Sequence, residues 1–503
     1  MFKSIISSTA YAGETRLFAR PSKLEEAEEG NPMKFVDREE ELARLQQLAH
    51  TGGLAVVWGR RRIGKTRLLL EWCKQRDGLY TVADQSAAPI QRHYFAASVA
   101  ARFVGFDQVY YPDWRSLLER ISAEAMHQQW RGPLIVDEFP YLVATSPELP
   151  SIFQAWVDHG AKEAQLTVAL AGSSQRMMQG LVISATEPLY GRATESFQLQ
   201  PLAAGYLSEA LRLAIARDVI LAYTAWGGVP RYWELMSESN LPLDRAVDHL
   251  VLSPLGPLHE EPERLLLEEL PPAVALRPIL DAIGLGAHRV SEIAARIGEP
   301  ATSLSRPLQR LMELGLIQRE IPFGASSASA KRSLYKIADP FCRMWFQVVA
   351  PNRGFLADAP ARAREKLWRK ARPGLVSTAW EDLCRQWVSL GAARHPRLKE
   401  MGDWEPARRF WHGEGPEWDV VSQTLDGRCV LLGEAKWAER PVDVPQLRSL
   451  TKTLFKKGIP AVKGLRDKDL LHVLFVPEVT EDTLVEIDGV TVVTGRQVVN
   501  EMR

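Results

Sequence analysis

Short apolar runs alternate with amphipathic segments along the chain as far as Leu202. Runs of this length are typical of buried strands, and apolar residues at helical spacing are typical of helices that cover a sheet. This alternation predicts a doubly wound parallel sheet over residues 33–203. The expected strands are Leu54–Trp58, Gly78–Asp84, Leu134–Val136 and Leu166–Gly172, and the expected helices include Met33–Ala49 (with Asp37 as N-cap), Leu117–Trp130 and Ser151–Ala164.

The pattern becomes helical after Leu202. A helical segment, Leu207–Tyr223, is followed by a break at Gly227–Gly228 and a new start at Pro230. Glycine pairs interrupt helices and proline favours their first turn. A small helical lid is therefore expected over residues 204–270.

Residues 271–350 predict a winged helix, since three short helices precede two strands. The second helix is Val290–Gly298 with Ser291 as its cap, and the third lies within Ser303–Glu320. Pro307 would disturb a helix interior, so the regular third helix is expected to begin near Ser305. The residues expected to contact DNA are Arg306, Gln309 and Arg310 on the third helix and Lys331 and Arg332 at the wing. A protein–protein joint is the alternative use of such a domain.

A basic segment separates this unit from the C-terminal region. Six of the eleven residues from Arg362 to Arg372 are Lys or Arg, within an expected linker helix over residues 351–372. The run could follow a phosphate backbone or form a solvated helix face. From Pro373 onward, a helix (Ser377–Val388) precedes two strands that flank the hairpin dipeptide Asp426–Gly427.

The first strand leads into the sequence Gly-x-x-x-x-Gly-Lys-Thr, the pattern of a phosphate-binding P-loop. Backbone N–H groups of such a loop, together with a helix N-terminus, cradle phosphates. Lys65 is expected to reach the β- and γ-phosphates of ATP, and the Thr66 hydroxyl to bind Mg²⁺. The expected nucleotide-binding residues of the loop are Gly59, Arg60, Arg61, Arg62, Ile63, Gly64, Lys65, Thr66 and Arg67. The three consecutive arginines either face the phosphates or lie in a solvated loop.

Two acids end the strand Leu134–Val136, at the edge of an open sheet where ligands bind. Asp137 is expected to hold Mg²⁺ and Glu138 to polarise the attacking water. Ser173, at the tip of the following strand, is expected to sense the γ-phosphate, with Ser174 as the second choice and a simple turn as the alternative. Arg192 is expected to reach the nucleotide of a neighbouring subunit or to serve a structural role.

A second cluster of charged residues lies in the C-terminal hairpin. Period-two alternation places Glu434 and Lys436 on one face of a strand, and Asp419 on the partner strand can reach that face. Glu381 on the preceding helix could join them. Two carboxylates can hold Mg²⁺ against a phosphodiester, so Asp419 and Glu434 are the expected metal ligands. Gln446 was also expected to support this cluster, whereas a surface hairpin with ordinary ion pairs is the alternative.

Composition adds few constraints. Lys plus Arg and Asp plus Glu both total 62 among 503 residues, so any nucleic-acid binding depends on local patches. The four cysteines are far apart, which suits a reducing cytoplasm. No apolar run approaches the ~18 residues of a membrane-spanning helix. Residues 1–32 are expected to form a disordered extension.

The segments FVDREEEL, GRRRIGKT, VDEFPYL, AGSSQRMM, PLYGR and GGVPRYW together resemble an AAA-type ATPase family of archaea and bacteria, near the STAND ATPases. That resemblance implies a winged helix and a C-terminal restriction-endonuclease-like domain of unknown function. The Asp419, Glu434 and Lys436 arrangement resembles the PD-(D/E)xK nuclease motif, with Glu417-Trp418-Asp419 in place of Pro-Asp.

The expected fold is thus multidomain α/β: a P-loop ATPase core, a helical lid, a winged helix and a nuclease-like domain over residues 373–503. The expected function is ATP hydrolysis with Mg²⁺ in a DNA-associated protein, coupled to a metal-dependent endonuclease. A nucleotide-controlled switch or scaffold, and a DNA-loading ATPase with an inactive nuclease fold, are the alternatives. DNA and further copies of the chain are the expected partners, with no membrane association.

Overall fold

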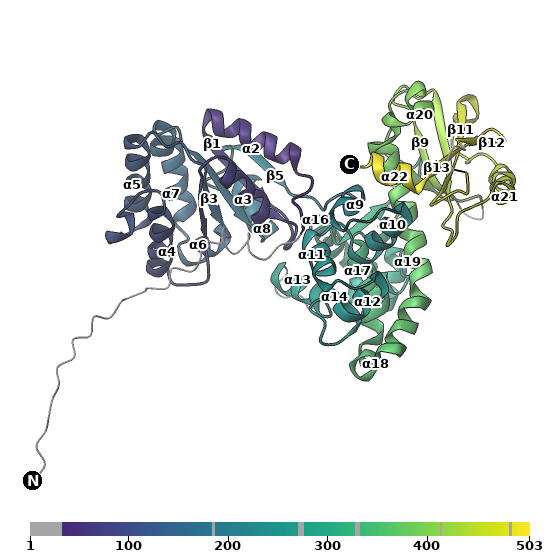
Figure 1. Cartoon of the computed structure of the whole chain (residues 1–503), viewed down its shortest axis with the longest axis horizontal. Helices are drawn as coiled ribbons and strands as arrows, with labels where there is room; N and C mark the ends of the chain where they lie inside the picture. The colour runs from purple at the N-terminus through teal and green to yellow at the C-terminus, as the bar shows by residue number, and fades with distance from the viewer. Residues whose placement is uncertain (1–32, 184–186, 270–275, 327–331, 413–414, 482–484) are drawn as a thin grey trace, which may run out of the picture.

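A computed structural model describes residues 33–183, 187–269, 276–326, 332–412, 415–481 and 485–503. Figure 1 shows a parallel-sheet unit at one end, a helical region in the middle and a second sheet unit at the other end. The N-terminal extension and Lys331 of the expected wing lie outside the described residues. In the described part, no helix is both long enough and apolar enough to cross a membrane.

The first unit contains the predicted parallel sheet, with strand order β2-β3-β4-β1-β5. Its strands are β1 (Gly53–Trp58), β2 (Leu79–Val82), β3 (Leu134–Asp137), β4 (Thr167–Gly172) and β5 (Ala193–Gln198). Its helices are α2 (Glu39–Thr51), α3 (Lys65–Gln75), α4 (Ala88–Ala100), α5 (Trp114–His127), α6 (Phe139–Thr145), α7 (Leu149–Trp156) and α8 (Gln175–Ile183). Sequence patterning missed β5, whose residues alternate between half-buried and exposed without an apolar run.

Several expected boundaries in this unit are corrected. Helix α2 begins at Glu39 after Arg38, whose left-handed backbone (φ 72°) makes it the N-cap in place of Asp37. Helix α5 begins at Trp114 because the Asp113 side chain accepts the Ser116 N–H. Both differences arise at helix starts: a side-chain hydrogen bond fixes the first turn of α5, whereas the Arg38 side chain makes no capping bond at α2.

The middle region is helical but is not a separate lid. Its elements are η3 (Ala204–Tyr206), α9 (Leu207–Ala210), α10 (Ala216–Trp226), α11 (Pro230–Ser239), α12 (Leu243–Val247), η4 (Asp248–Leu252) and α13 (Glu261–Glu269). The expected helix Leu207–Tyr223 is split between α9 and α10. Trp226 and Trp233 are fully buried in a core shared with α17 (Pro340–Met344), where Tyr232 and Phe341 have ring centroids 4.5 Å apart.

The winged helix forms as predicted, with an antiparallel β6–β7 pair. Its elements are α14 (Arg277–Gly284), α15 (Val290–Ile297), η6 (Ala301–Leu304), α16 (Ser305–Glu313), β6 (Ile317–Glu320) and β7 (Leu334–Ile337). Helix α16 begins at Ser305 and keeps Pro307 in its first turn, where a missing N–H leaves no intrahelical bond unmade. Ser291 is not the cap of α15, because Arg289 holds that position and Glu292 accepts the backbone N–H groups of Arg289 and His288.

A continuous helical path then leads to the C-terminal unit. It comprises α17, η8 (Trp345–Val349), η9 (Ala350–Asn352), α18 (Arg353–Asp358) and α19 (Ala361–Leu390). The 30-residue helix α19 runs through the expected boundary at residues 372–373, with Pro373 inside it. The basic linker helix and the first helix of the C-terminal domain are therefore one element.

The C-terminal unit is a mixed sheet with strand order β12-β13-β11-β10-β9-β8. Its strands are β8 (Arg408–Phe410), β9 (Trp418–Gln423), β10 (Cys429–Ala435), β11 (Asp469–Val476), β12 (Glu486–Ile487) and β13 (Val490–Thr494). Its helical elements are η10 (Ala392–Arg394), α20 (Pro396–Met401), α21 (Val444–Lys456), η11 (Leu465–Asp467) and α22 (Gly495–Glu501). Strand β10 pairs antiparallel with β9 and parallel with β11. Along the chain, α19 and α20 precede β8, β9 and β10, and α21 and β11 follow them.

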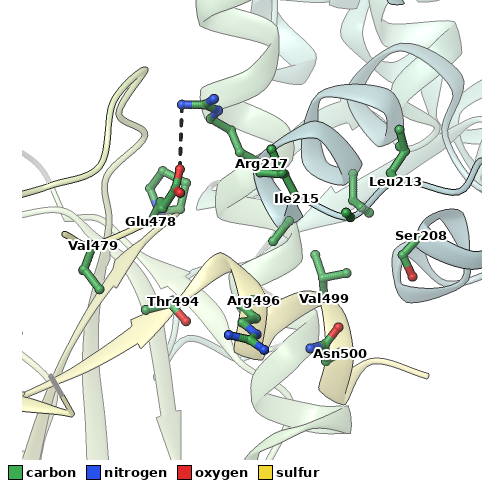
Figure 2. Close-up of a pocket in the computed structure, with 14 residues that line it drawn as sticks. Ser208, Leu213, Ile215, Arg217, Glu478, Val479, Thr494, Arg496, Val499 and Asn500 are labelled. Atoms are coloured by element: carbon green, nitrogen blue, oxygen red, sulfur yellow. Dashed lines mark ion pairs between the residues drawn. The ribbon is translucent and has the colours of Figure 1, made fainter. Parts of the chain in front are cut away.

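Helix α10 of the middle region meets this C-terminal unit across a cleft of ≈ 440 Å³. Arg217 of α10 donates to the Glu439 carbonyl at 2.8 Å and lies 3.8 Å from the Glu478 carboxylate. Figure 2 shows this ion pair beside Thr494 and Val499 of the last strand and helix. The helical region and the C-terminal sheet are thus in direct contact.

Candidate functional site

The P-loop between β1 and α3 has a tightly curled backbone. Gly59 has φ 154° and Gly64 has φ 95°, and a Cβ on Gly59 would lie 2.8 Å from the Leu199 carbonyl oxygen. Glycine is therefore required at position 59 for a close backbone approach. Lys65 is only 6% exposed, and its Nζ donates to the carbonyls of Gly59 (2.7 Å) and Arg60 (3.1 Å). The lysine thus lies within the curl of the loop.

The acidic end of β3 lies beside this loop. The Thr66 hydroxyl donates to Asp137 Oδ2 at 2.8 Å, so the two residues expected to hold Mg²⁺ are adjacent. The Tyr80 hydroxyl donates to the same oxygen at 2.6 Å. Burial and Asp137 raise the pKa of Tyr80, which keeps the phenol protonated as a donor. Tyr80 was not identified from the sequence, because only the β2–β3 pairing brings it to this site.

Glu138 and Ser173 form a second contact at this edge of the sheet. Glu138 adopts a left-handed conformation (φ 54°) at the start of α6. Its Oε2 accepts hydrogen bonds from the Ser173 hydroxyl (2.9 Å) and backbone N–H (3.3 Å). The structure therefore places Ser173 directly on the acid that was expected to polarise water.

Three arginines of the P-loop, Arg60, Arg62 and Arg67, form ion pairs outside the loop, and their expected contact with the nucleotide stays a prediction. Arg61 is exposed. Each of the three others meets a carboxylate far away in sequence, and this pairing offsets the cost of burying a charge. The pairs are Arg60–Asp339 (2.9 Å), Arg62–Glu261 (2.7 Å) and Arg67–Glu234 (3.1 Å).

Arg192 lies apart from the P-loop contacts. Its guanidinium binds Asp158 at 3.1 Å and donates to the Tyr190 carbonyl at 3.0 Å. The side chain is about one-third exposed. Within one chain it therefore has a local partner, and a role toward a neighbouring subunit stays a prediction.

A small cleft adjoins the P-loop and was not identified from the sequence. A Cβ on Gly64 would lie 3.5 Å from Pro230 Cγ, so the segment after the glycine pair covers the loop. The break at Gly227–Gly228 was the available signal, because it lets Pro230 turn back onto Gly64. The cleft is lined by Met33, Phe35, Val36, Arg38, Ile63, Gly64, Arg67, Leu202 and Pro230.

The charged residues of the C-terminal hairpin come together as expected. The β9–β10 register pairs Val420 with Gly433, and its continuation places Asp419 opposite Glu434. Lys436 Nζ lies 2.5 Å from Glu434 Oε1, and Asp419 Oδ2 accepts the Ala435 N–H at 3.1 Å. Glu434 is buried. Two carboxylates and a lysine thus share one face of the sheet.

Helix α19 adds further charged groups to this face. Arg385 donates to the Asp419 carbonyl at 2.8 Å and lies 3.7 Å from Glu381. Burial and the Asp419 carboxylate raise the pKa of Glu381 to about 6. Burial and Glu434 likewise raise the pKa of Asp419. The three acids are therefore close enough to repel one another.

Two parts of this cluster differ from expectation. Lys457, at the end of α21, forms a second ion pair with Glu434 and donates to the Glu417 carbonyl at 2.8 Å. Gln446 does not reach the cluster, because its side chain accepts the Asp443 N–H in the cap of α21.

The expected metal site at this cluster has limited support. In the ranges that the structure describes, no group of three or more His, Cys, Asp or Glu side chains is arranged to hold a metal. The donors available here are the carboxylates of Asp419 and Glu434, and two lysines already bind Glu434.

The raised pKa of Glu381 predicts a pH-dependent effect on stability. A carboxyl group with a raised pKa destabilises the folded state when ionised, so the penalty develops as pH rises from about 4.5 to about 6. Glu381→Gln should raise the free energy of unfolding by about 1–2 kcal/mol at pH 8 and by much less at pH 4.5. Urea denaturation at both pH values measures this difference.

Glu365→Gln is the matched control on the same helix, where Glu365 pairs with Arg369 at an exposed position. Its effect should stay within about 0.5 kcal/mol at either pH. Equal effects of the two substitutions would contradict the assigned repulsion between Glu381 and Asp419.

Comparisons with known families support the ATPase and winged-helix units. Residues 35–236 match an ATPase domain predominantly from Archaea. Residues 266–320 match the IclR helix-turn-helix domain. Residues 345–449 match a family of archaeal and bacterial proteins of unknown function.

Individual proteins are also similar to this chain. An uncharacterized protein of Methanocaldococcus jannaschii is 28% identical over 444 residues, covering 88% of this chain and 95% of the relative. The Walker-type ATPase PABY2304 of Pyrococcus abyssi has a TM-score of 0.51 at 20% identity, covering 62% of this chain and 96% of that protein. The Aeropyrum pernix ORC2 protein has a TM-score of 0.42 at 15% identity, covering 71% and 98%. Residues 35–236 are therefore similar to an ATPase domain found predominantly in Archaea, and residues 266–320 are similar to a helix-turn-helix domain.

Proposed function

We propose that the chain binds and hydrolyses ATP with Mg²⁺ and acts in association with DNA. The observation that carries the ATPase proposal is the hydrogen bond from Thr66 to Asp137 beside the P-loop, with Glu138 held next to them. A bound Mg²⁺ would neutralise charge on the β- and γ-phosphates. Thr66 and Asp137 would hold it, and Lys65 would leave its two carbonyl partners for the phosphates.

Glu138 would orient and deprotonate the attacking water. Its carboxylate needs a fixed direction for this role, and Ser173 supplies it through a hydroxyl and a backbone N–H on one oxygen. Both bonds fall on Oε2, so within the described part of the chain Oε1 would be the oxygen that accepts the water. The apolar side chains of Phe35, Val36 and Pro230 would cover the base of the nucleotide.

Substitutions at this site should separate binding from hydrolysis. Lys65→Ala should abolish nucleotide binding. Glu138→Gln should bind normally but hydrolyse about 10²–10⁴-fold more slowly, because only proton abstraction is lost. The rate of ATP hydrolysis by Ser173→Ala should lie between the rates of Glu138→Gln and the wild type. Phosphate release and titration with a fluorescent nucleotide measure the two properties.

Ser174→Ala is the matched control, since the Ser174 carbonyl accepts the Met178 N–H and this backbone bond survives the substitution. Hydrolysis at the wild-type rate in both Lys65→Ala and Glu138→Gln would contradict the proposed site.

The DNA proposal rests on two exposed basic surfaces. On α16, Arg306 and Gln309 are exposed and Arg310 is half-buried, on the helix that corresponds to the recognition helix of a winged helix. On α19, the exposed members of the basic run are Arg362, Lys366, Arg369 and Lys370, which recur at helical spacing along one face.

The basic surface of α19 is smaller than the sequence indicated. Arg364 binds Asp248 at 2.7 Å and Arg372 binds Asp244 at 3.0 Å, so both tie α19 to the helical region. Contact with a phosphate backbone would therefore use the four exposed residues.

The salt dependence of DNA binding tests this surface. Lys366→Gln with Lys370→Gln should lower the slope of log K against log salt by about 2, because each lost phosphate contact removes roughly 0.9. Fluorescence anisotropy on duplex DNA across a salt series measures the slope. Lys399→Gln, at an exposed position on α20, should leave it unchanged. An unchanged slope in the double variant would contradict DNA contact through α19.

We further propose a metal-dependent nuclease activity for the C-terminal unit. Three antiparallel strands followed by a helix and a parallel strand (β8-β9-β10-α21-β11) support this proposal, as does the shared face of Asp419, Glu434 and Lys436. A bound Mg²⁺ would activate water and neutralise the scissile phosphate. Asp419 and Glu434 would hold it, and Lys436 would orient the water.

A switch without cleavage is the second candidate, and the Lys457–Glu434 ion pair favours it. This pair gives Glu434 a cationic partner from the chain itself in addition to Lys436. Nucleotide would then control conformation and DNA binding only.

Plasmid cleavage distinguishes the two candidates. With ATP and Mg²⁺ or Mn²⁺, the wild type should nick or linearise plasmid DNA, and Asp419→Ala should lose cleavage while keeping ATP hydrolysis. Lys457→Ala should bind metal more tightly, because it frees a carboxylate oxygen of Glu434. Wild-type protein that leaves linear, circular and branched DNA uncut would favour the switch.

A further inference from the structure

The side chain of Arg60 connects the P-loop to the helical region. Its Nη2 lies 2.9 Å from Asp339 Oδ2, and the side chains of the two residues are 8% and 4% exposed. Its Nε is buried without a hydrogen-bond acceptor among the described residues. The guanidinium therefore has one ionic partner, Asp339. Its Nε–H is a further donor, which could bind a second anionic oxygen.

Asp339 joins this ion pair to the start of a helix. Its Oδ1 accepts the Cys342 N–H at 2.8 Å, which makes Asp339 the N-cap of α17. A Cβ on Gly227 would lie 3.3 Å from Asp339 Oδ2, so Gly227 packs against the same carboxylate. A change in the Arg60 pair would therefore act directly on the first turn of α17.

Arg343, one helical turn further along α17, donates its backbone N–H to the Asp339 carbonyl at 2.9 Å. Its Nη2 donates to the Ile337 carbonyl (3.1 Å) at the end of β7 and to Asp382 of α19 (2.7 Å). Asp382 also binds Lys336 of β7 at 2.5 Å and pairs with Arg385. The wing strand, α17 and α19 thus meet at one buried carboxylate.

Arg385 completes the path at the C-terminal cluster, where it holds the Asp419 carbonyl at 2.8 Å and lies beside Glu381. The polar path therefore runs from Arg60 through Asp339, Arg343 and Asp382 to Arg385. Every member is at least half-buried.

We propose that this path transmits the nucleotide state of the P-loop to the Asp419 cluster, with Asp339 as the positioning residue. The inference rests on the proposed binding of ATP. A contiguous path alone does not establish coupling, which needs an element with two states. Arg60 provides that element: among the described residues its guanidinium pairs with Asp339, and phosphate oxygens beside the loop would compete for it. A weaker Arg60–Asp339 pair would free the start of α17.

Hydrogen–deuterium exchange on the full-length protein tests the inference, comparing saturating ATPγS and Mg²⁺ with no nucleotide. In the wild type, exchange should change in the P-loop and also in Cys342–Val349 and Trp418–Gln423, by about fivefold or more at the distant segments. Asp339→Asn keeps a capping side chain for α17 but removes the charge that binds Arg60. It should keep the nucleotide response of the P-loop and lose the distant responses.

Glu261→Gln is the matched control, because Glu261 binds the neighbouring Arg62 but lies off the path. This variant should keep all three responses. A wild type that responds in the P-loop alone, or an Asp339→Asn variant with wild-type responses, would overturn the inference. A wild type without any response in the P-loop would instead overturn the proposed nucleotide binding.

Discussion

One hydrophobic core joins units that the sequence suggested were separate. It includes Val57 and Leu69 of the ATPase unit, Trp226 and Trp345 of the helical region, and Phe475 of the C-terminal sheet. Large aromatic side chains make burial of this kind strongly favourable. The helical region therefore cannot swing as an independent lid without exposing apolar surface. A conformational change made through small shifts of charged contacts within the shared interface would cost less free energy than exposing that surface.

The ATPase unit was largely predictable because its signals are local. A strand, a glycine-bearing loop and a helix follow one another in sequence, and Asp137 directly ends its strand. The arginines of the loop were not predictable in the same way. Arg60 meets Asp339, which lies 279 positions further along the chain, and no local periodicity indicates such a partner. The same limit applies to Tyr80 and Pro230, which reach the site through strand pairing and a turn.

The C-terminal cluster shows where strand periodicity succeeds and where it stops. Alternation along β10 placed Glu434 and Lys436 together, and the hairpin dipeptide implied that Asp419 would lie on the partner strand. Both expectations depend only on neighbouring strands. Lys457 and Arg385 reach the cluster from helices, so their contribution required the packing of α21 and α19. Gln446 was misplaced because its local capping bond to Asp443 competes with any tertiary contact.

These helix-borne cations change the electrostatic argument for the cluster. The cluster expected from the sequence holds three acids and one lysine, and close carboxylates repel one another unless a cation lies between them. In the folded chain, Lys457 is a second cation on Glu434, and Arg385 lies beside Glu381. Repulsion is thus partly neutralised by the protein itself, although the pKa values of Glu381 and Asp419 remain raised. A metal would therefore have to compete with Lys436 and Lys457 for Glu434. Arg385 also binds Asp382 on the same helix, α19. The position of α19 therefore affects how easily a metal can replace the lysines at Glu434.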